Sequence, residues 1–435
     1  MEDCAQDSGE TWKWDGGRAI MGQLDRCINV EDYRALARRR LPRPIVDFFD
    51  GGAEDERTQS RNRAAFQGWA LVPRAMNDVS RVSARARVLQ QDLEWPFIVG
   101  PTGMPGLLHP DGEIGIALAA EKVGALYSLS TMASRSIEEV ATATSGPKAF
   151  QLYLFRDRGL TLELLQRAKA AGYKALILTV DVQVPSNRER DRRSGMVIPP
   201  KFTAKTFMDF AASPRWCFNT LLRRPVTLAN FAGSRADPGV ALLTFINEQF
   251  DPSIGWHDLE WVAKHWGGPL AIKGILSPRD AELACHHGAD AVILSNHGGR
   301  QLDAAVAPMD VLPAVVDSIG DRAEIILDGG IRRATDMAKA IALGAKACMA
   351  GRVGLYGLGA GGARGAAGAL GALRAEFDRN LALLGVTDVA QIGRSNVMRL
   401  DAAAQLPASV DGLSATQAPA LARQVHPGDN TEPAS

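Results

Sequence analysis

The chain has 435 residues, and its 49 lysines and arginines balance its 49 aspartates and glutamates, so the formal net charge is zero at pH 7. This balance provides no overall positive field, and nucleic acid is not an expected partner. The 46% hydrophobic and 23% charged residues are typical of a globular protein, and the length suits one barrel of about 250 residues with additions. The five cysteines form no CxxC pair, which predicts reduced thiols and a cytoplasmic location.

The first elements in chain order precede any repeating pattern. Residues 1–28 show no apolar periodicity and are predicted to be a flexible extension, in which Met21 is a second candidate start. Residues 31–40 and 54–66 are predicted helices. Residues 82–95 predict a small hairpin that could close the bottom of a barrel.

A strand–helix alternation then runs from about residue 96 to residue 351. Its repeated signal is a helix ending in Gly followed by a buried apolar strand, as in AKAAGYKALILTV and CHHGADAVILSN. Ser136 with Glu139, and Ser277 with Pro278, mark two helix starts. The eight predicted strands are residues 97–100, 125–129, 149–153, 175–180, 270–273, 291–295, 324–327 and 345–349.

Eight parallel α/β units predict a closed (β/α)8 TIM barrel, with residues 29–395 as one domain. The alternative is a doubly wound open sheet, which is disfavoured because no G-x-G-x-x-G follows the first strand. Residues 396–435, rich in Ala, Gln, Pro and Ser, are predicted to be a disordered tail.

One interval breaks the repeat. Roughly 90 residues separate the fourth and fifth strands, so residues 197–250 are predicted to be an insertion. Within residues 197–233, aromatic and leucine side chains alternate with basic ones, and Asp209 is the only acid. The large apolar residues are Phe202, Phe207, Phe210, Trp216, Phe218, Leu221 and Leu222, and the basic ones are Lys201, Lys205, Arg215, Arg223 and Arg224. This mixture predicts either a segment that lies on a membrane surface or a lid packed on the barrel.

Polar residues, together with glycines and one proline, lie at the carboxyl ends of all eight predicted strands. They are Pro101, Thr102, Gly103, Ser130, Gln151, Tyr153, Thr179, Asp181, Lys273, Ser295, His297, Asp328, Gly329, Gly330, Gly351 and Arg352. Because barrel active sites form at the carboxyl ends of strands, we expect these residues to line one pocket. No metal site is expected among them.

The segment SNHGGRQLD (residues 295–303) carries the sharpest chemical signal. Two glycines between His297 and Arg300 let the backbone approach a planar ligand. Arginine can bind a carboxylate while histidine removes a proton, so the pair suits an anionic substrate. The alternative is a histidine held in a turn for structural reasons.

Two further motifs end strands seven and eight, where such barrels usually bind phosphate. In DGGIR (residues 328–332) and AGR (residues 350–352), backbone N–H groups with Arg332 and Arg352 could hold a phosphate. Asp328 would repel it and is assigned to ribityl hydroxyls instead. Lys273 could form a Schiff base or place a charge beside a flavin, and the phosphate site favours the second.

With these motifs the chain resembles the FMN-dependent α-hydroxy acid oxidase and dehydrogenase family over residues 29–395. The resemblance implies substrate contacts from Tyr33, Tyr153, Arg188, His297 and Arg300. It implies FMN contacts from Pro101, Thr102, Gly103, Ser130, Gln151, Thr179, Lys273, Ser295, Asp328, Gly329, Gly330, Arg332, Gly351 and Arg352.

The implied reaction is oxidation of an L-2-hydroxy acid to the 2-oxo acid. Arg188 and Arg300 would bind the carboxylate with help from Tyr33, and Tyr153 would contact the hydroxyl. His297 would take a proton while Asp181 stabilises the imidazolium. Whether that proton comes from Cα or from the hydroxyl stays open. Lys273 would neutralise the reduced flavin.

Within the family, the motifs INVEDYRALARRRLP, GPTGM and LANF resemble bacterial mandelate dehydrogenases, whereas DPSIGWHDLEW and RRSGM resemble L-lactate dehydrogenases. Gly103 stands where the oxidases carry alanine. These likenesses imply an (S)-mandelate dehydrogenase-like enzyme that passes electrons to membrane quinone. They also imply a homotetramer that lies peripherally on the cytoplasmic face of the inner membrane. The alternatives are an L-lactate dehydrogenase, an O2-using oxidase and, from another class, a flavin-free lyase that uses Lys273.

Overall fold

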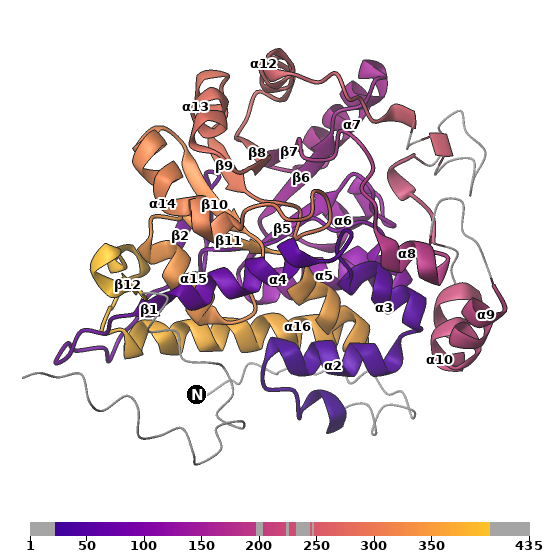
Figure 1. Ribbon diagram of the computed structural model, residues 1–435, viewed down its shortest axis with the longest axis horizontal. Coiled ribbons are helices and arrows are strands. Elements are labelled where there is room, and N and C mark those ends of the chain that lie inside the picture. Colours follow the sequence, from indigo (N-terminus) through magenta and orange to yellow (C-terminus); the bar gives the residue numbers. More distant parts are fainter. Residues whose placement is uncertain (1–21, 197–202, 223–225, 232–243, 246–247, 401–435) are drawn as a thin grey trace, which may run out of the picture.

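The computed structural model describes residues 22–196, 203–222, 226–231, 244–245 and 248–400. Eight parallel strands close into a barrel in the order β10-β11-β4-β5-β6-β7-β8-β9 (Figure 1). They are β4 (Phe97–Val99), β5 (Leu126–Ser130), β6 (Lys148–Tyr153), β7 (Ala175–Thr179), β8 (Leu270–Ile275), β9 (Ala291–Leu294), β10 (Glu324–Asp328) and β11 (Ala347–Ala350). The predicted barrel is confirmed, and the open sheet is excluded because β11 pairs with β4.

Small and branched apolar side chains fill the barrel interior. Ala149, Ala175, Ile177, Ala271 and Ile293 are fully buried within one cluster. The same cluster contains Val88, Leu89 and Leu93 from β2 (Ala86–Val88) and β3 (Gln91–Leu93). The antiparallel β2–β3 pair therefore closes one end of the barrel, as the hairpin prediction required.

Helices surround the barrel and cover the outer face of each strand. They are α5 (Gly112–Lys122), α6 (Ile137–Ala143), α7 (Arg158–Ala170), α12 (Trp256–Trp266), α13 (Pro278–His286), α14 (Pro308–Ile319), α15 (Ala334–Ala342) and α16 (Arg352–Leu383). Ser136 and Glu139 form the predicted capping box of α6, and Ser277 caps α13 ahead of Pro278. Both local predictions are confirmed. Short 3-10 turns occur at η2 (Pro105–Leu107), η5 (Gly320–Arg322), η6 (Val389–Gln391) and η7 (Arg394–Asn396).

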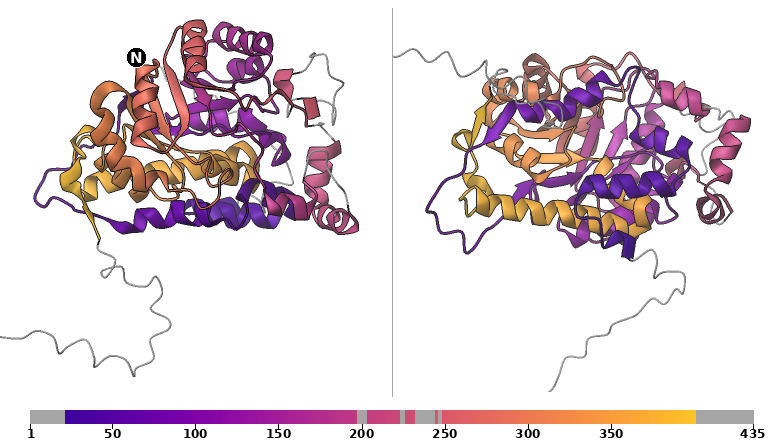
Figure 2. Two further views of the ribbon diagram at one scale, coloured as in Figure 1. Left: turned by 45° about the horizontal axis from the view of Figure 1, so that its top comes forward. Right: turned by 60° about the horizontal axis from the view of Figure 1, so that its bottom comes forward.

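The helices α2 (Val30–Arg40), α3 (Arg43–Asp50) and α4 (Arg57–Ala64) lie between residue 29 and the barrel, and α4 continues into η1 (Ala65–Gly68). The first and third match predicted helices, whereas α3 was not predicted. Figures 1 and 2 show α2 running alongside α16. Packing of α2 on α16 and of α3 on α8 attaches this region to the barrel.

Both predicted boundaries of the barrel domain need a small correction. Strand β12 (Val397–Arg399) pairs with β1 (Trp69–Leu71), so the chain is still ordered after residue 396. Leu24 is buried, and a Cβ added at Gly361 would meet its side chain, so residues 22–28 belong to the folded unit. The rest of the predicted extension and tail lies outside the described residues.

The insertion after β7 contains α8 (Glu189–Ser194), α9 (Ala204–Ala211), α10 (Pro214–Trp216), the π-helical η3 (Cys217–Leu222) and η4 (Ala229–Phe231). In Figures 1 and 2, α9 and α10 lie at the edge of the molecule opposite the β1–β12 pair. Within the described residues, no helix is both long enough and apolar enough to cross a membrane.

Candidate active site

A cavity of about 310 Å³ opens at the carboxyl ends of the barrel strands. It brings together most of the residues predicted from the sequence. Those that line it are Pro101, Thr102, Gly103, Ser130, Tyr153, Arg188, Lys273, His297, Arg300, Asp328, Gly329, Gly330, Arg332, Gly351 and Arg352. The four strand-end residues Gln151, Thr179, Asp181 and Ser295 lie behind this lining and contact or neighbour its members.

His297 is held by two contacts. Its Nδ1 lies 3.0 Å from Asp181 Oδ1, and its backbone N–H donates to Ser295 Oγ at 3.0 Å. Burial by itself would raise the pKa of Asp181, but His297 and Lys273 together hold that pKa below its usual value. Asp181 is therefore a carboxylate at neutral pH, and it fixes the ring so that Nε2 is the nitrogen left for substrate.

The backbone at this motif follows an unusual path. His297 has φ 57°, and Gly298 and Gly299 also lie in the left-handed region. A Cβ at position 299 would lie 2.6 Å from the backbone nitrogen of Gln59. Glycine at 299 is thus required by both conformation and space, while His297 carries strain of a kind found at functional sites.

Lys273 belongs to a buried polar cluster beneath the cavity. Its Nζ lies 2.8 Å from Ser295 Oγ and 3.0 Å from Asp328 Oδ2, and Ser295 donates to that same carboxylate at 2.8 Å. Burial would lower the pKa of Lys273, but Asp328 and Asp181 outweigh it and raise that pKa. Lys273 therefore stays protonated, which argues against a Schiff-base nucleophile and for a fixed positive charge.

Two arginines are bound to main-chain carbonyls rather than to acids. Arg300 donates to the carbonyls of Phe48 at 2.7 Å and Gly51 at 3.0 Å. Arg352 donates to Phe49 at 3.1 Å, Gly51 at 2.8 Å and Gly298 at 2.9 Å. Neither forms an ion pair with any residue in the described ranges. Burial lowers the pKa of Arg300 well below its ordinary value, and Arg188 and Arg352 lower it further. Guanidinium groups remain charged in proteins, so this environment favours a bound anion.

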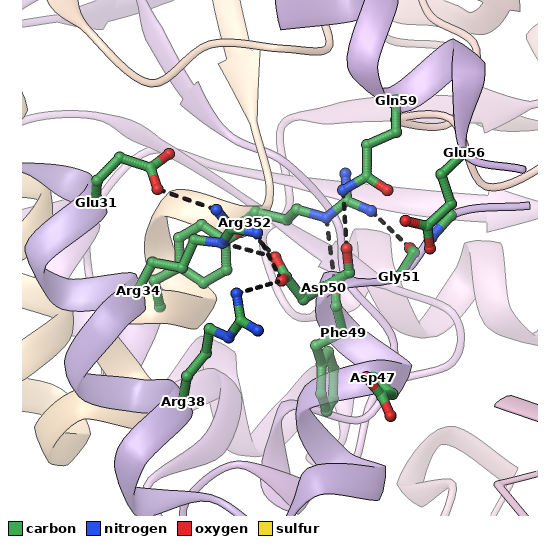
Figure 3. A network of polar contacts seen from close by, with 12 residues as sticks. Glu31, Arg34, Arg38, Asp47, Phe49, Asp50, Gly51, Glu56, Gln59 and Arg352 are labelled. Atoms are coloured by element: carbon green, nitrogen blue, oxygen red, sulfur yellow. Dashed lines mark hydrogen bonds and ion pairs between the residues drawn. The ribbon is translucent and has the colours of Figure 1, made fainter. Parts of the chain in front are cut away.

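Apart from that of Gly298, the carbonyls that hold these arginines come from the end of α3, which is fixed by a network of hydrogen bonds and ion pairs (Figure 3). Asp50 accepts from Arg34 Nε at 3.0 Å and Nη2 at 2.7 Å, and from the Tyr356 hydroxyl at 2.6 Å. Burial would raise the pKa of Asp50, but Arg34 and Tyr356 bring it to about 2. Gln59 donates to the Asp50 carbonyl at 2.8 Å. This network keeps the α3 terminus, and with it Arg300 and Arg352, in place.

Several buried polar atoms near the cavity lack a protein partner. Gln151 Nε2 and Thr179 Oγ1 have no hydrogen bond to any described residue, although both side chains are almost fully buried. Gln151 Oε1, in contrast, accepts from Ser130 Oγ at 3.1 Å. Buried donors are normally satisfied, so these atoms fit a ligand with polar ring edges, as a flavin has. Arg332 Nη2 lies 3.3 Å from the Tyr356 hydroxyl, and its Nε lies 3.6 Å from Glu31 Oε1, which is an ion pair but too long for a hydrogen bond. This guanidinium therefore keeps a donor that suits the phosphate end of such a ligand.

The predicted substrate contact of Tyr33 is wrong. Tyr33 lies on α2, buried against α16, and a Cβ at Gly368 would collide with its phenolic oxygen. The cavity is lined instead by Phe48 of α3, whose ring centroid lies 5.4 Å from the Arg188 guanidinium and 5.6 Å from that of Arg300. Phe48 was not among the predicted site residues because α3 was not predicted, although the segment RPIVDFFDGG lies directly between the two predicted helices.

A second aromatic residue was also missed. Phe250 lines the cavity and packs edge-on against Tyr153, with ring centroids 5.3 Å apart. It is the last residue of the predicted insertion, where the sequence gives no strand-end signal. Phe48 and Phe250 thus add apolar walls to the polar residues that the sequence did identify.

Comparison with known proteins places these features in a family. The model of the FMN-dependent dehydrogenase family matches residues 37–399. (S)-Mandelate dehydrogenase of Pseudomonas putida is 41% identical over 365 residues, covering 84% of this chain and 92% of that protein. L-Lactate dehydrogenase of Caulobacter sp. (strain K31) is 39% identical over 376 residues, covering 86% and 99%. The solved structure of the monotopic membrane protein (S)-mandelate dehydrogenase has 40% identity and a TM-score of 0.84, covering 86% of this chain and all of that one.

Proposed function

Because the chain belongs to the FMN-dependent dehydrogenase family, we propose that it oxidises an aryl L-2-hydroxy acid, (S)-mandelate or a close analogue, to the 2-oxo acid. The coarser activity is that of its relatives: the chain is an FMN-dependent 2-hydroxy acid dehydrogenase, an oxidoreductase acting on a CH–OH donor. The choice of an aryl substrate rests mainly on the aromatic walls of the cavity.

The residues of this chain take separate tasks in that reaction. Arg188 and Arg300 bind the substrate carboxylate, and Tyr153 contacts the hydroxyl. Nε2 of His297 accepts the proton released on oxidation, and Asp181 stabilises the imidazolium that results. Tyr33 has no part in this assignment.

The FMN site is assigned from the same geometry. Gln151, Thr179 and Lys273 would contact the ring system of FMN, and Asp328, which pairs with Lys273, would bind ribityl hydroxyls. Arg332, Arg352 and the backbone at Gly329 and Gly330 would hold the phosphate. Residues 101–103, together with Ser130, Ser295 and Gly351, complete the contacts. Bound there, FMN supplies a two-electron acceptor.

The aromatic walls support an aryl substrate. Phe48 and Phe250 line the cavity together with Met104, Met132 and Val182. These side chains can bury a phenyl ring, whereas a methyl group would leave much of that surface without contact. Arg188 and Arg300, which are assigned to the substrate carboxylate, lie over the Phe48 ring. The apolar and charged parts of the site are therefore adjacent.

We expect kcat/KM for (S)-mandelate to exceed that for L-lactate by roughly 10- to 100-fold, which corresponds to the free energy gained when a phenyl group is buried. Steady-state turnover with an artificial electron acceptor measures the ratio. Phe250→Ala should reduce the preference and leave L-lactate turnover nearly unchanged. An enzyme that prefers L-lactate would move the assignment to a lactate dehydrogenase, and peroxide released at each turnover would favour an oxidase.

The site of action is proposed to be the cytoplasmic face of the inner membrane, with quinone as electron acceptor and a homotetramer as the assembled form. The insertion supports membrane contact because Phe207, Met208 and Phe218 are 72%, 64% and 52% exposed. Other residues of the insertion act as a lid: Trp216 donates to the Leu107 carbonyl at 2.8 Å, and Phe231 packs on Phe155. The exposed residues of the segment therefore support membrane contact, and the packed residues support the lid interpretation. Phe202, Leu221 and Leu222 lie outside the described side chains.

Replacing only the exposed residues tests the membrane contact without disturbing the lid. We expect the triple variant F207S/M208S/F218S to remain in the supernatant when vesicles are sedimented, because it lacks the apolar groups that enter the headgroup boundary. Anaerobic flavin reduction by substrate should be unchanged. The matched control M76S/L118S/L383S removes three exposed apolar residues elsewhere and should still sediment with vesicles. Equal sedimentation of the F207S/M208S/F218S variant and the wild type would contradict membrane contact through the insertion.

A further inference from the structure

A second cavity, of about 700 Å³, lies where the insertion meets the N-terminal helices. Its lining comes from α2, α3, α8 and α9 and comprises Arg38, Leu41, Arg43, Val46, Asp47, Arg190, Arg193, Ser194, Thr206 and Asp209. We refer to it as the arginine cleft. It shares no lining residue with the active-site cavity, which is lined by Phe48 and Phe49 of the same helix α3.

The arginine cleft gathers four guanidinium groups around one cavity. Its lining also contains two aspartates, and acids outside the lining pair with three of the arginines: Arg38 with Asp50, Arg190 with Glu56 and Arg193 with Glu189. The side chains of Arg43 and Arg193 are 72% and 75% exposed. Arg43 reaches Asp47 only at 3.6 Å, and Arg193 pairs with Glu189 of its own helix. Ion pairs between side chains this exposed are weak, so both guanidinium groups can exchange their acid for a phosphate.

Arg38 adds a further cation with little compensation. Its Nη1 lies 4.0 Å from Asp50, whose carboxylate already accepts hydrogen bonds from Arg34 and Tyr356. Arg190 is the least exposed of the four arginines, and it pairs with both Glu56 and Asp47. Three arginines from α2, α3 and α8 are therefore available to bind an anion from different directions.

The position of the cleft indicates where that anion comes from. Thr206 and Asp209 of α9 line the cleft, and the two residues between them, Phe207 and Met208, are exposed. Thr206 Oγ1 donates to the Ser194 carbonyl at 3.2 Å, which ties α9 to α8 beside the cleft. Figures 1 and 2 show α8 and α9 next to α3 at the same edge of the molecule. An acyl chain beside Phe207 and Met208 would place its headgroup near the arginines.

We propose that the arginine cleft binds the phosphate of an anionic phospholipid headgroup, an inference that rests on the membrane contact proposed above. Guanidinium groups bind phosphate oxygens in a planar, two-pronged manner, and several of them around one cavity give selectivity over a zwitterionic headgroup. The cleft would then fix the orientation of the enzyme on the membrane, in addition to the apolar contact of α9.

The test uses the intact holoenzyme and a water-soluble ligand. Binding of dihexanoyl phosphatidylglycerol, below its micellar concentration, is measured by calorimetry for wild type, R43Q/R193Q and the control R85Q/R87Q. The control removes two charges of similar exposure (76% and 66%) from the β2–β3 hairpin. We expect R43Q/R193Q to weaken lipid binding by roughly 10- to 30-fold, since each arginine near an anionic headgroup contributes to the binding free energy. The control variant should bind like wild type.

Two further measurements distinguish a lipid headgroup from free phosphate, and binding by the arginine cleft from the apolar contact of α9. Inorganic phosphate should bind much more weakly than the short-chain lipid. Sedimentation with phosphatidylglycerol vesicles should fall in R43Q/R193Q, while weak binding to phosphatidylcholine vesicles, which reports the apolar contact, should stay unchanged. The proposal is overturned if the soluble lipid does not bind, if both double variants lose binding equally, or if free phosphate binds as well as the lipid. Failure of wild type to bind any vesicle would contradict the membrane contact itself, and the soluble-lipid measurement would still decide the cleft.

Discussion

Replacing His297 with alanine is expected to slow reduction of the flavin by substrate by roughly 10²–10⁴-fold, the usual contribution of a positioned general base. His297 lines the cavity, and its Nδ1 is taken by Asp181 at 3.0 Å, so Nε2 is the nitrogen that can accept a proton from substrate. The side chain makes no hydrogen bond to Lys273 or Arg332, and FMN should therefore remain bound.

Anaerobic stopped-flow absorbance with saturating substrate measures this rate directly, and the flavin content of the purified variant reports cofactor retention. His287→Ala is the matched control, because that ring pairs with Glu260 at 2.7 Å and lines neither of the cavities described here. It should reduce its flavin at the wild-type rate. A His297→Ala enzyme with near-normal flavin reduction would place the base elsewhere.

The strand-end residues of the site could be predicted from the sequence because topology constrains them. Once eight parallel strands are recognised, their carboxyl ends must meet on one face, and residues such as Lys273, His297 and Asp328 follow directly. No knowledge of side-chain packing is needed for that step. The glycines of the SNHGGRQLD segment could be interpreted in the same way, since Gly299 has a positive φ and no room for a Cβ.

The N-terminal contribution to the site could not be predicted in this manner. Tyr33 and Phe48 both precede the barrel, and which of them reaches the cavity depends on how α2 and α3 pack on α16 and α8. That packing is set by long-range contacts such as the Arg34–Asp50 and Tyr356–Asp50 hydrogen bonds. A motif match places a residue in a segment and does not determine the direction of its side chain.

The insertion shows a related limit. Composition indicated aromatic and basic residues but could not separate exposed ones from packed ones. Phe207 is exposed on α9, whereas Trp216 is buried and donates a hydrogen bond to the Leu107 carbonyl. Aromatic residues therefore have two different roles within a short stretch of chain, and only tertiary contacts distinguish these roles.

The second large effect is expected from Asp181→Asn, which keeps the size of the side chain and removes its charge. Flavin reduction should fall by roughly 10²–10⁴-fold, as when an acid that orients a catalytic histidine is replaced by its amide. The Asp181 carboxylate accepts a hydrogen bond from Nδ1–H, which leaves Nε2 free to take a proton. An asparagine amide can instead donate to Nδ1, which moves the ring proton to Nε2 and blocks it as a base.

The measurement must separate this effect from a loss of structure. Asp181→Asn should keep its melting temperature within a few degrees, because the backbone carbonyl of residue 181 still accepts from Gln301 at 2.8 Å. Asp181→Glu would be a poor control, since the extra methylene group moves the carboxylate out of its 3.0 Å contact with His297 Nδ1. Gln301→Ala, which removes the backbone contact and keeps the carboxylate, should retain most of the rate. If Asp181→Asn reduces its flavin as fast as Gln301→Ala, the carboxylate has no role in orienting His297.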